Sequence, residues 1–385
     1  MKKICFVTGT RADYGILYCL MKKFQEDKET EFQLIVTGTH LSSAYGNTIQ
    51  EIERDQFPVS KKIDILLSSR SKVSVVKSLG LATIGFSEAF DELKPDLLII
   101  IGDRFEILAA AQAALILNIP VAHLHGGELT QGAFDESIRH SLTKMSHLHF
   151  VSTESYKKRV IQLGETPTSV FNVGAPGIDR IKSVRTLTAD ELQKKLDLKI
   201  SKPYFVVTYH PVTLAHEGGV EELKELLGAL EKNLSSHDFI FTMPNADPDS
   251  QVFFDLMKKF CDHHGQRYFN SLGSLNYFSL LEHSAGVVGN SSSALIEAPY
   301  FNVPTVNIGK RQLGRVTGSS VINVDAKEFE IVKALKQATF MKGQEFRSSH
   351  LYGDGDGESS EKIFKIIKAI PDFMTFIQKK FHDLE

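Results

Sequence analysis

Short apolar runs alternate with longer amphipathic segments along most of the chain. In the first half the apolar runs are 4–8, 32–37, 97–101, 119–122 and 147–151, with a more polar run at 61–67 that we expect near a sheet edge. Between them, segments such as 72–93 place apolar residues at helical spacing. Regular alternation of strands and helices predicts a parallel sheet with helices on both faces.

A second series of the same kind begins at Tyr204. Its predicted strands are 204–209, 238–242, 267–269, 286–289, 304–308 and 321–324, and its predicted helices are 220–232, 250–264, 275–283 and one opening at 291–293. The charged segment 182–202 between the two series has little core-forming content and is interpreted as a linker. We therefore expect an α/β protein with two Rossmann-like domains, residues 1–181 and 182–365.

Composition narrows the class of protein. The chain has 385 residues, of which 42% are hydrophobic and 24% charged, with a net charge of −3. This balance argues against nucleic-acid binding by phosphate neutralisation. The three cysteines show no ligand spacing, no signal peptide is visible, and no apolar stretch approaches the ~20 residues of a membrane span. We expect a soluble, cytoplasmic protein without a membrane partner.

Polar residues follow two of the apolar runs in the first half. The run 97–101 ends in Gly102-Asp103-Arg104, and the run 119–122 ends in the sequence HLHGGE. Parallel strands place the residues that follow them at one sheet edge, the usual position of an α/β active site. The candidates for this edge are Asp103, Arg104, His125, Glu128, Asp135, Glu136, Arg139 and His140. Acid/base groups beside fixed cations suit proton transfer near an anionic leaving group.

The turn after the first run, GTRADYG at 9–15, precedes a helix. A nucleotide site is plausible there because helix N-termini attract phosphate, yet neither glycine-rich phosphate-binding pattern is present. Arg11 is a candidate phosphate contact. The alternative, that Arg11 is a surface turn residue, stays open from this stretch alone.

Three further turns follow apolar runs in the second half. They contain His210, Asn245 and the sequence GNSSS at 289–293, with Glu297 a turn further on. The serines and backbone amides of this helix start are a plausible diphosphate seat, and Glu297 could accept two ribose hydroxyls. Arg311 would add a cation. An ordinary helix cap is the alternative for GNSSS, but the other polar strand ends favour a nucleotide site.

Metal binding is not expected. The pairs His123/His125 and His147/His149 place both rings on one strand face, but no third ligand of matching spacing accompanies them. The sequence DGDGE at 354–358 resembles a calcium loop only faintly, because Ser359 and Lys365 stand where Gly and Glu are needed. Strand-end histidines commonly form hydrogen bonds.

With these residues in view, the chain resembles the hydrolysing UDP-N-acetylglucosamine 2-epimerases of bacterial sialic-acid biosynthesis. The resemblance spans nearly the whole chain. It rests on these motifs: VTGTRADYG at 7–15, VTGTH with AYGNT at 36–48, GDR at 102–104, HGGE at 125–128, DESIRHS at 135–141, HPVT at 210–213, GNSSSALIEAP at 289–299 and NIGKRQLGR at 307–315.

This resemblance implies a glycosyltransferase-B-like fold with the active site in the interdomain cleft and a C-terminal helix at about 366–385 packing back on the first domain. It implies loss of UDP by anti elimination to 2-acetamidoglucal and hydration to N-acetylmannosamine, with no cofactor. Asp103 and Asp135 match positions assigned to catalysis. The matches to UDP contacts are Arg11, His210, Asn245, Ser291, Ser292, Glu297, Arg311 and, less closely, Arg104.

One departure concerns the acid/base group. Many relatives carry HIEGGE, with a catalytic Glu where this chain has His125. Either His125 serves as the acid/base, as its near-neutral reference pKa permits, or Glu128 does; we favour His125.

Three other readings remain. The substrate could be UDP-2,4-diacetamido-2,4,6-trideoxyglucose, as in the legionaminic-acid route. A glycosyltransferase of the same fold would keep the nucleotide seat without needing the acid/base groups, and a non-catalytic nucleotide-sugar sensor would not need the density of charged groups. The family also implies a homodimer or homotetramer, for which the apolar segments 72–93 and 104–117 are candidates.

Overall fold

The protein is described from a computed structural model, which covers residues 1–69, 71–212, 214, 219–244, 250–344, 346, 351–353 and 357–384. The chain divides into two compact units. The first comprises Met1–Glu128, Phe134–Arg180 and Tyr352–Glu385, and the second comprises Leu129–Ala133 and Ile181–Leu351.

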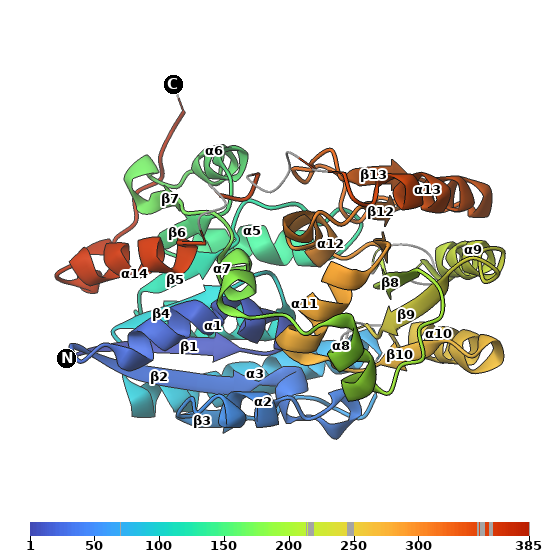
Figure 1. The fold of residues 1–385 in the computed structure, drawn as a ribbon. Helices are drawn as coiled ribbons and strands as arrows, with labels where there is room; N and C mark the ends of the chain where they lie inside the picture. The colour runs from blue at the N-terminus through green and yellow to red at the C-terminus, as the bar shows by residue number, and fades with distance from the viewer. Residues whose placement is uncertain are drawn as a thin grey trace. The chain divides into compact units, whose positions relative to one another are not determined.

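The first unit is built on a seven-stranded parallel sheet of order β3-β2-β1-β4-β5-β6-β7 (Figure 1). Its strands are β1 (Lys2–Thr8), β2 (Thr30–Thr37), β3 (Lys61–Ile63), β4 (Leu97–Ile101), β5 (Val121–Leu124), β6 (Leu148–Val151) and β7 (Val170–Asn172). The central strands read as unbroken apolar runs because both of their faces are buried. The polar run that begins at Lys61 forms the edge strand, as expected.

Helices cover both faces of this sheet. They are α1 (Arg11–Glu26), α2 (Ile49–Arg54), α3 (Lys72–Leu93), α4 (Phe105–Ile116), α5 (Asp135–Met145), α6 (Glu154–Gln162), α7 (Pro176–Ser183) and α14 (Ser359–Ala369). One core cluster packs α1 and α14 against the sheet, and another packs α3 and α4 against its opposite face. The strand order reverses between β1 and β4, the position where α/β sheets bind ligands beyond the strand ends.

The second unit has a six-stranded parallel sheet of order β10-β9-β8-β11-β12-β13. Its strands are β8 (Tyr204–Thr208), β9 (Asp238–Thr242), β10 (Arg267–Phe269), β11 (Gly286–Gly289), β12 (Thr305–Ile308) and β13 (Val321–Val324). Its helices are α8 (Ala189–Leu196), α9 (Val220–Glu231), α10 (Ser250–His264), α11 (Gly273–His283), α12 (Ser293–Ile296) and α13 (Glu328–Met341). Here the order reverses between β8 and β11. The expected α/β class with two Rossmann-like domains is thus confirmed.

Two expected segments differ from the structure. The charged segment 182–202 contains α8, whose start is closed by a capping box between Thr188 and Glu191 and whose Leu192 is buried. It is therefore part of the second unit and not an unstructured linker. The C-terminal helix, expected at about 366–385, is α14: Asp179 accepts from the amides of Ser359 and Ser360 at its start. The helix ends at Ala369, because Pro371 disfavours helical geometry at the residue before it, Ile370.

Helix α3 is the one helix in the described ranges that is long and apolar enough, by length and composition, to cross a membrane. The composition of this segment is more apolar than we expected. Only 33% of its most apolar window is buried, with Val73, Val76 and Ile84 exposed. Its other face packs against α4 within the first unit.

Candidate active site

Charged side chains gather where β4 and β5 of the first unit end. Asp103 follows β4 after Gly102, whose φ of +79° favours glycine. His125 and Glu128 follow β5, and Arg139 reaches the same place from the second turn of α5. The predicted convergence of these residues is therefore present in the structure.

Arg139 is the centre of this cluster. Its Nη1 donates to the carbonyl of His125 at 2.8 Å, its Nη2 pairs with Asp103, and Nη1 lies 3.9 Å from Glu128 Oε2. Burial alone would lower the pKa of the guanidinium, but the surrounding carboxylates outweigh it and raise that pKa above its ordinary value. Arg139 thus stays charged and fixes both an acid and the backbone of the neighbouring histidine.

His125 and Glu128 form a buried pair. His125 Nδ1 donates to Glu128 Oε1 at 2.5 Å, and the hydroxyl of Ser152 donates to the same oxygen at 3.1 Å. The other ring nitrogen of His125, Nε2, is buried and has no hydrogen-bond partner among the described residues. The two groups therefore differ in role: the histidine keeps one ring nitrogen uncommitted to these residues, and the carboxylate orients the ring through the other nitrogen.

The backbone of His125 is unusual. Its φ of +63° lies in the left-handed region, which non-glycine residues rarely adopt and which costs of order 1–3 kcal/mol. This conformation turns the chain just beyond β5, so His123 and His125 do not share a strand face as we expected. The bond from Arg139 to its carbonyl stabilises the turn.

The other histidines in or next to the strands form hydrogen bonds with nearby backbone or side-chain groups. His123 Nε2 donates to the Gly102 carbonyl at 2.8 Å, His149 Nε2 donates to Glu165 Oε2 at 2.9 Å, and His147 Nδ1 accepts from the Val121 amide. Burial lowers the pKa of His123 to about 3, so its ring is neutral. Within the described part of the chain no three His, Cys, Asp or Glu side chains are grouped as metal ligands would be.

The remaining candidates of the first unit flank this cluster. Asp135 begins α5, one turn before Arg139, and interacts with it electrostatically. On the same helix, His140 Nε2 lies 3.2 Å from Glu136 Oε1. Arg104 follows Asp103 directly and precedes α4, while Arg11 begins α1 after β1.

In the second unit, Asn290 joins the loops after β8 and β11. It is fully buried, its Oδ1 accepts from the His210 amide at 2.7 Å, and its Nδ2 donates to the His210 carbonyl at 2.9 Å. Arg311 Nη1 and Gln312 Nε2 both donate to the Asn290 carbonyl, at 3.0 and 2.8 Å. Residues from three strand ends are thereby held in one rigid arrangement at the sheet's reversal point.

The predicted diphosphate seat lies in the same place. Gly289 has a φ of +143°, and a Cβ there would lie 1.9 Å from the Thr208 carbonyl, so only glycine lets β8 and β11 approach this closely. Ser291 and Ser292 follow it, and α12 is a single short turn beginning at Ser293. Because the helix is so short, its dipole contributes less than we expected, and the amides and hydroxyls of the turn are the principal donors.

Glu297 is already oriented by its own helix. The Ser293 hydroxyl donates to Glu297 Oε2, and the Tyr277 hydroxyl lies 2.6 Å from Ser293 Oγ. Two predicted features lie outside the described residues: Asn245 and most of the 354–358 loop.

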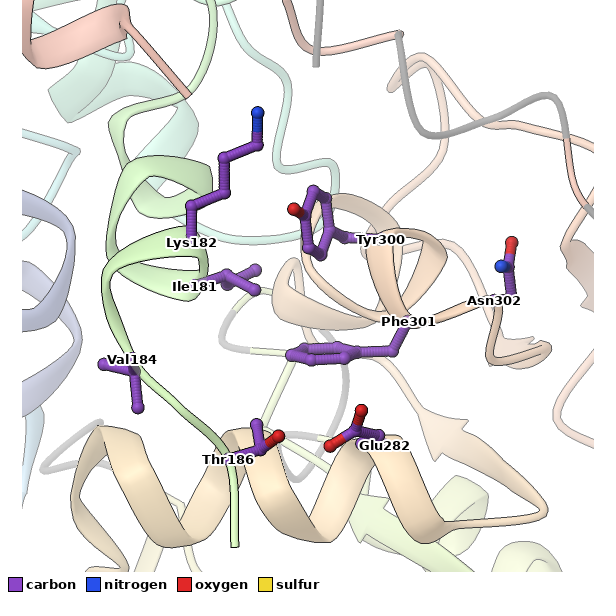
Figure 2. A pocket seen from close by; sticks show the side chains of 8 residues that line it. All are labelled: Ile181, Lys182, Val184, Thr186, Glu282, Tyr300, Phe301 and Asn302. Atoms are coloured by element: carbon purple, nitrogen blue, oxygen red, sulfur yellow. The ribbon is translucent and has the colours of Figure 1, made fainter. Parts of the chain in front are cut away.

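The second unit also contains a cavity of about 540 Å³ away from these residues. Figure 2 shows the side chains that line it. The rings of Tyr300 and Phe301 meet edge-on there, with centroids 5.8 Å apart, and Lys182 and Glu282 border the cavity. None of the predicted site residues lines it.

Sequence reasoning left two central residues out of the site. Arg139 was noted at the sheet edge without a role, and Asn290 was seen only as part of GNSSS. The spacing Asp135-x-x-x-Arg139, which places both on one face of a helix start, is the signal for the first. For Asn290 the sequence offers no such signal, because an asparagine that hydrogen-bonds the backbone of a distant loop follows no particular residue spacing.

Comparison with known proteins bears on what this arrangement does. The sequence profile described as UDP-N-acetylglucosamine 2-epimerase matches residues 22–368. A GDP/UDP-N,N'-diacetylbacillosamine 2-epimerase (hydrolyzing) of Campylobacter jejuni is 40% identical over 100% of this chain and 99% of its own. The chain belongs to the UDP-N-acetylglucosamine 2-epimerase family.

Other members of the family agree with this assignment. Polysialic acid biosynthesis protein P7 of Escherichia coli is 41% identical over 100% of this chain and 97% of its own length. The solved UDP-GlcNAc 2-epimerase of Methanocaldococcus jannaschii, in complex with UDP-GlcNAc and UDP, has a TM-score of 0.79 at 19% identity, covering 95% of this chain and 99% of its own. The expected resemblance to the hydrolysing 2-epimerases is confirmed. The protein is an enzyme of that family, and its fold is glycosyltransferase-B-like.

Proposed function

We propose that this enzyme hydrolyses UDP-N-acetylglucosamine to N-acetylmannosamine and UDP with inversion at C2. The observation that carries the proposal is the buried His125–Glu128 pair, in which His125 Nε2 has no hydrogen-bond partner among the described residues, together with Arg139, which joins the His125 carbonyl to Asp103. Such a pair has no evident purpose in a glycosyltransferase or a sensor. Acid/base groups held by a fixed cation suit a reaction that moves protons as an anion departs.

The reaction has two steps. A base removes the C2 proton, the C2–H electron pair forms the C1–C2 double bond, and the C1–oxygen bond to UDP breaks. Water then adds its oxygen to C1 of the resulting 2-acetamidoglucal, and C2 takes up a proton from the face opposite to the one it lost. The products are N-acetylmannosamine and UDP, and the atoms balance without a redox cofactor.

We assign the proton transfers to the first unit. His125 Nε2 acts as one acid/base group, with Glu128 as its positioning residue, because the carboxylate binds Nδ1 and fixes the tautomer. Asp103 and Asp135 supply the carboxylates of the second transfer, and both interact electrostatically with Arg139. Because the C2 proton is removed from one face of the sugar and a new proton is delivered to the opposite face, the reaction requires at least two such groups.

We assign the nucleotide to the second unit. The turn at Ser291 and Ser292 offers donors to the diphosphate, with Arg311 as a cation, and Glu297 is placed to accept ribose hydroxyls. His210 belongs to the same arrangement through Asn290. In the first unit, Arg11 and Arg104 add cations for the leaving group.

A second substrate deserves the same test. Relatives named as acting on diacetylbacillosamine, from Campylobacter jejuni and from Legionella pneumophila, are 40% and 37% identical to this chain. That sugar is the UDP-2,4-diacetamido-2,4,6-trideoxyglucose of the alternative, which differs from N-acetylglucosamine at C4 and C6. The chemistry at C1 and C2 would be the same.

The test is a direct comparison of kcat/KM for the two UDP-sugars, with UDP release measured in the absence of any acceptor. The proposal predicts acceptor-independent release and a higher kcat/KM for UDP-N-acetylglucosamine. A higher value for the trideoxy sugar would transfer the assignment to that substrate. Release that requires an acceptor would contradict the epimerase reaction itself.

Two further properties belong to the proposal. We propose that the exposed apolar face of α3, with the end of α4 at Leu115 and Ile116, pairs with a second copy of the chain in a homo-oligomer. We also propose a cytoplasmic location, which is consistent with the absence of a disulfide at Cys5, Cys19 and Cys261 in the described part of the chain.

A further inference from the structure

The reversal point of the first sheet, between β1 and β4, holds charged groups that the proposed reaction has not used. The loop after β1 contributes Gly9, the first turn of α1 contributes Asp13, and the first turn of α4 contributes Glu106. Arg104 lies between the end of β4 and that helix. In parallel α/β sheets this is the position at which a ligand approaches the strand ends.

Glu106 engages Arg104 directly. Glu106 is 1% exposed, and its Oε1 accepts from Arg104 Nε at 2.6 Å. A hydrogen bond to Nε fixes the plane of a guanidinium, so it also fixes the directions of the Nη donors. An acidic residue in the first turn would favour the helix from an exposed position as well, so burial of this side chain against Arg104 needs another reason.

Gly9 brings the loop after β1 against this pair. A Cβ at position 9 would lie 2.6 Å from Glu106 Oε1 and 2.7 Å from its Cγ. The Gly9 amide donates to Asp13 Oδ2 at 3.3 Å, and its carbonyl accepts from the Thr39 amide at 2.9 Å. The chain beyond β1 therefore packs directly against the carboxylate of Glu106, and the bond from Thr39, beyond β2, holds Gly9 in that place.

The charges at this point are unequal. Burial raises the pKa of Asp13 to about 7, the Arg104 charge opposes that rise, and Glu106 adds to it. Glu106 Oε2 is buried without a hydrogen-bond partner in the part of the chain that the structure describes. Arg104 therefore lies near two carboxylates, and one of them, Glu106, has an oxygen without a hydrogen-bond partner among the described residues. A contribution to folding stability alone does not explain this arrangement.

We propose that Glu106 is a positioning residue that fixes the orientation of the Arg104 guanidinium, so that Arg104 can serve as a cation for the diphosphate of the nucleotide sugar, with Gly9 as the backbone that admits the Glu106 carboxylate. The inference rests on the proposed function, because it takes the leaving group from that reaction. It adds a role for two residues, Glu106 and Gly9, that bind no substrate themselves. Arg104 acts on the ground state and the departing anion alike, so its orientation affects substrate binding more than the chemical step.

The test compares Glu106→Gln, Glu106→Asp, Arg104→Lys and the double variant Glu106→Gln/Arg104→Lys. Two quantities are measured for each: the Kd of UDP by calorimetry, and kcat and KM for the UDP-sugar. Glu165→Gln is the matched control, because Glu165 is also a buried, ion-paired carboxylate of the first unit. Thermal unfolding of every variant separates loss of fold from loss of orientation.

We expect Glu106→Gln to raise the Kd of UDP and KM about tenfold, with a smaller change in kcat, since the bond to Arg104 Nε loses the charge of the carboxylate and is weakened. Glu106→Asp should recover part of the affinity. In the Arg104→Lys background, Glu106→Gln should change both constants less than about twofold, because the partner through which it acts is absent. The control should bind UDP as the wild type does.

Equal effects of Glu106→Gln in both backgrounds would overturn the inference, as would an unchanged Kd of UDP. A loss of UDP affinity in Glu165→Gln equal to that in Glu106→Gln would do so too, because it would mark a general effect of stability. If the wild type binds UDP but does not turn over either UDP-sugar, the proposed function fails while the coupling in UDP affinity still decides the role of Glu106. If the wild type does not bind UDP, both fail.

Discussion

His125 Nδ1 lies 2.5 Å from Glu128 Oε1, and this bond leaves Nε2 as the nitrogen of the ring without a partner among the described residues. The sequence motif HLHGGE places two acid/base residues three positions apart without saying which one acts. The geometry distinguishes the two residues: His125 keeps Nε2 for a substrate, whereas Glu128 binds Nδ1 and orients the ring.

This separation predicts unequal losses. His125→Ala should lower kcat by about 10²–10⁴, the range for loss of a general acid/base, whereas Glu128→Gln should cost less because an amide oxygen still accepts from Nδ1. UDP release under saturating UDP-sugar measures both. Near-normal turnover of His125→Ala, or a greater loss in Glu128→Gln, would assign the role to the carboxylate instead.

Arg139 should be important for stability as well as for activity. Arg139→Met leaves the half-buried Asp103 and the buried Glu128 without this cation, which should cost roughly 3–5 kcal/mol in the free energy of unfolding. Urea denaturation measures it, and adding Asp103→Asn should restore part of the loss. The control is Lys224→Met, which breaks an exposed pair with Glu221 and should cost under about 1 kcal/mol. Equal effects of the two single variants would show that Arg139 is not the centre of the cluster.

Acid should destabilise the first unit through Glu165. Its buried carboxylate pairs with His149, Lys144 and Lys379, and these bonds outweigh the opposing effect of burial and lower its pKa from 4.5 to about 2. A lowered carboxylate pKa adds stability that is complete above pH 4.5 and is lost as the pH falls toward 2, about 3 kcal/mol in all.

The measurement is the free energy of unfolding between pH 5 and 3. Wild type should lose stability more steeply than Glu165→Gln across this window, while the exposed control Glu92→Gln should follow wild type. His123, whose pKa falls from 6.5 to about 3, also favours the unfolded state as acid is added, equally in all three proteins. Parallel curves for wild type and Glu165→Gln would contradict the role of this ion cluster.

The α3 face should determine the oligomeric state. Val76 and Ile84 are 67% and 59% exposed, and replacing both with glutamate should make pairing of this face unfavourable. Light scattering should give a multiple of the monomer mass of 42.9 kDa for wild type and the monomer mass for the double variant. Phe329→Glu, at an exposed apolar position of α13, is the control and should keep the wild-type mass. A monomeric wild type would refute the proposal.

Much of the fold could be predicted from the sequence because buried parallel strands are continuous apolar runs. The bounds of α3, α10, β10 and β11 agree with those expected, since each is flanked by clear turn or capping residues. Helix α8 is not among the expected elements because most of its residues are charged or polar, although the capping box between Thr188 and Glu191 marks its start. Segment Leu129–Ala133, which groups with the second unit although it follows β5 of the first, has no local signal at all.

The site was predictable to the extent that strand ends share an edge. Asp103, His125, Glu128 and Arg139 meet because β4 and β5 are neighbours in a parallel sheet. The left-handed backbone of His125 could not be foreseen, because histidine adopts it only uncommonly and the Arg139 bond to its carbonyl comes from a helix further along the chain. The role of Asn290 likewise depends on contacts between loops far apart in sequence.

The most direct test of the central claim is hydrolysis of UDP-N-acetylglucosamine in deuterated water, followed by NMR. The elimination and hydration mechanism predicts free N-acetylmannosamine carrying deuterium at C2, together with UDP, in the absence of any acceptor. Product that keeps its original C2 proton, or free N-acetylglucosamine with unchanged C2 configuration, would contradict proton transfer at C2 by this site.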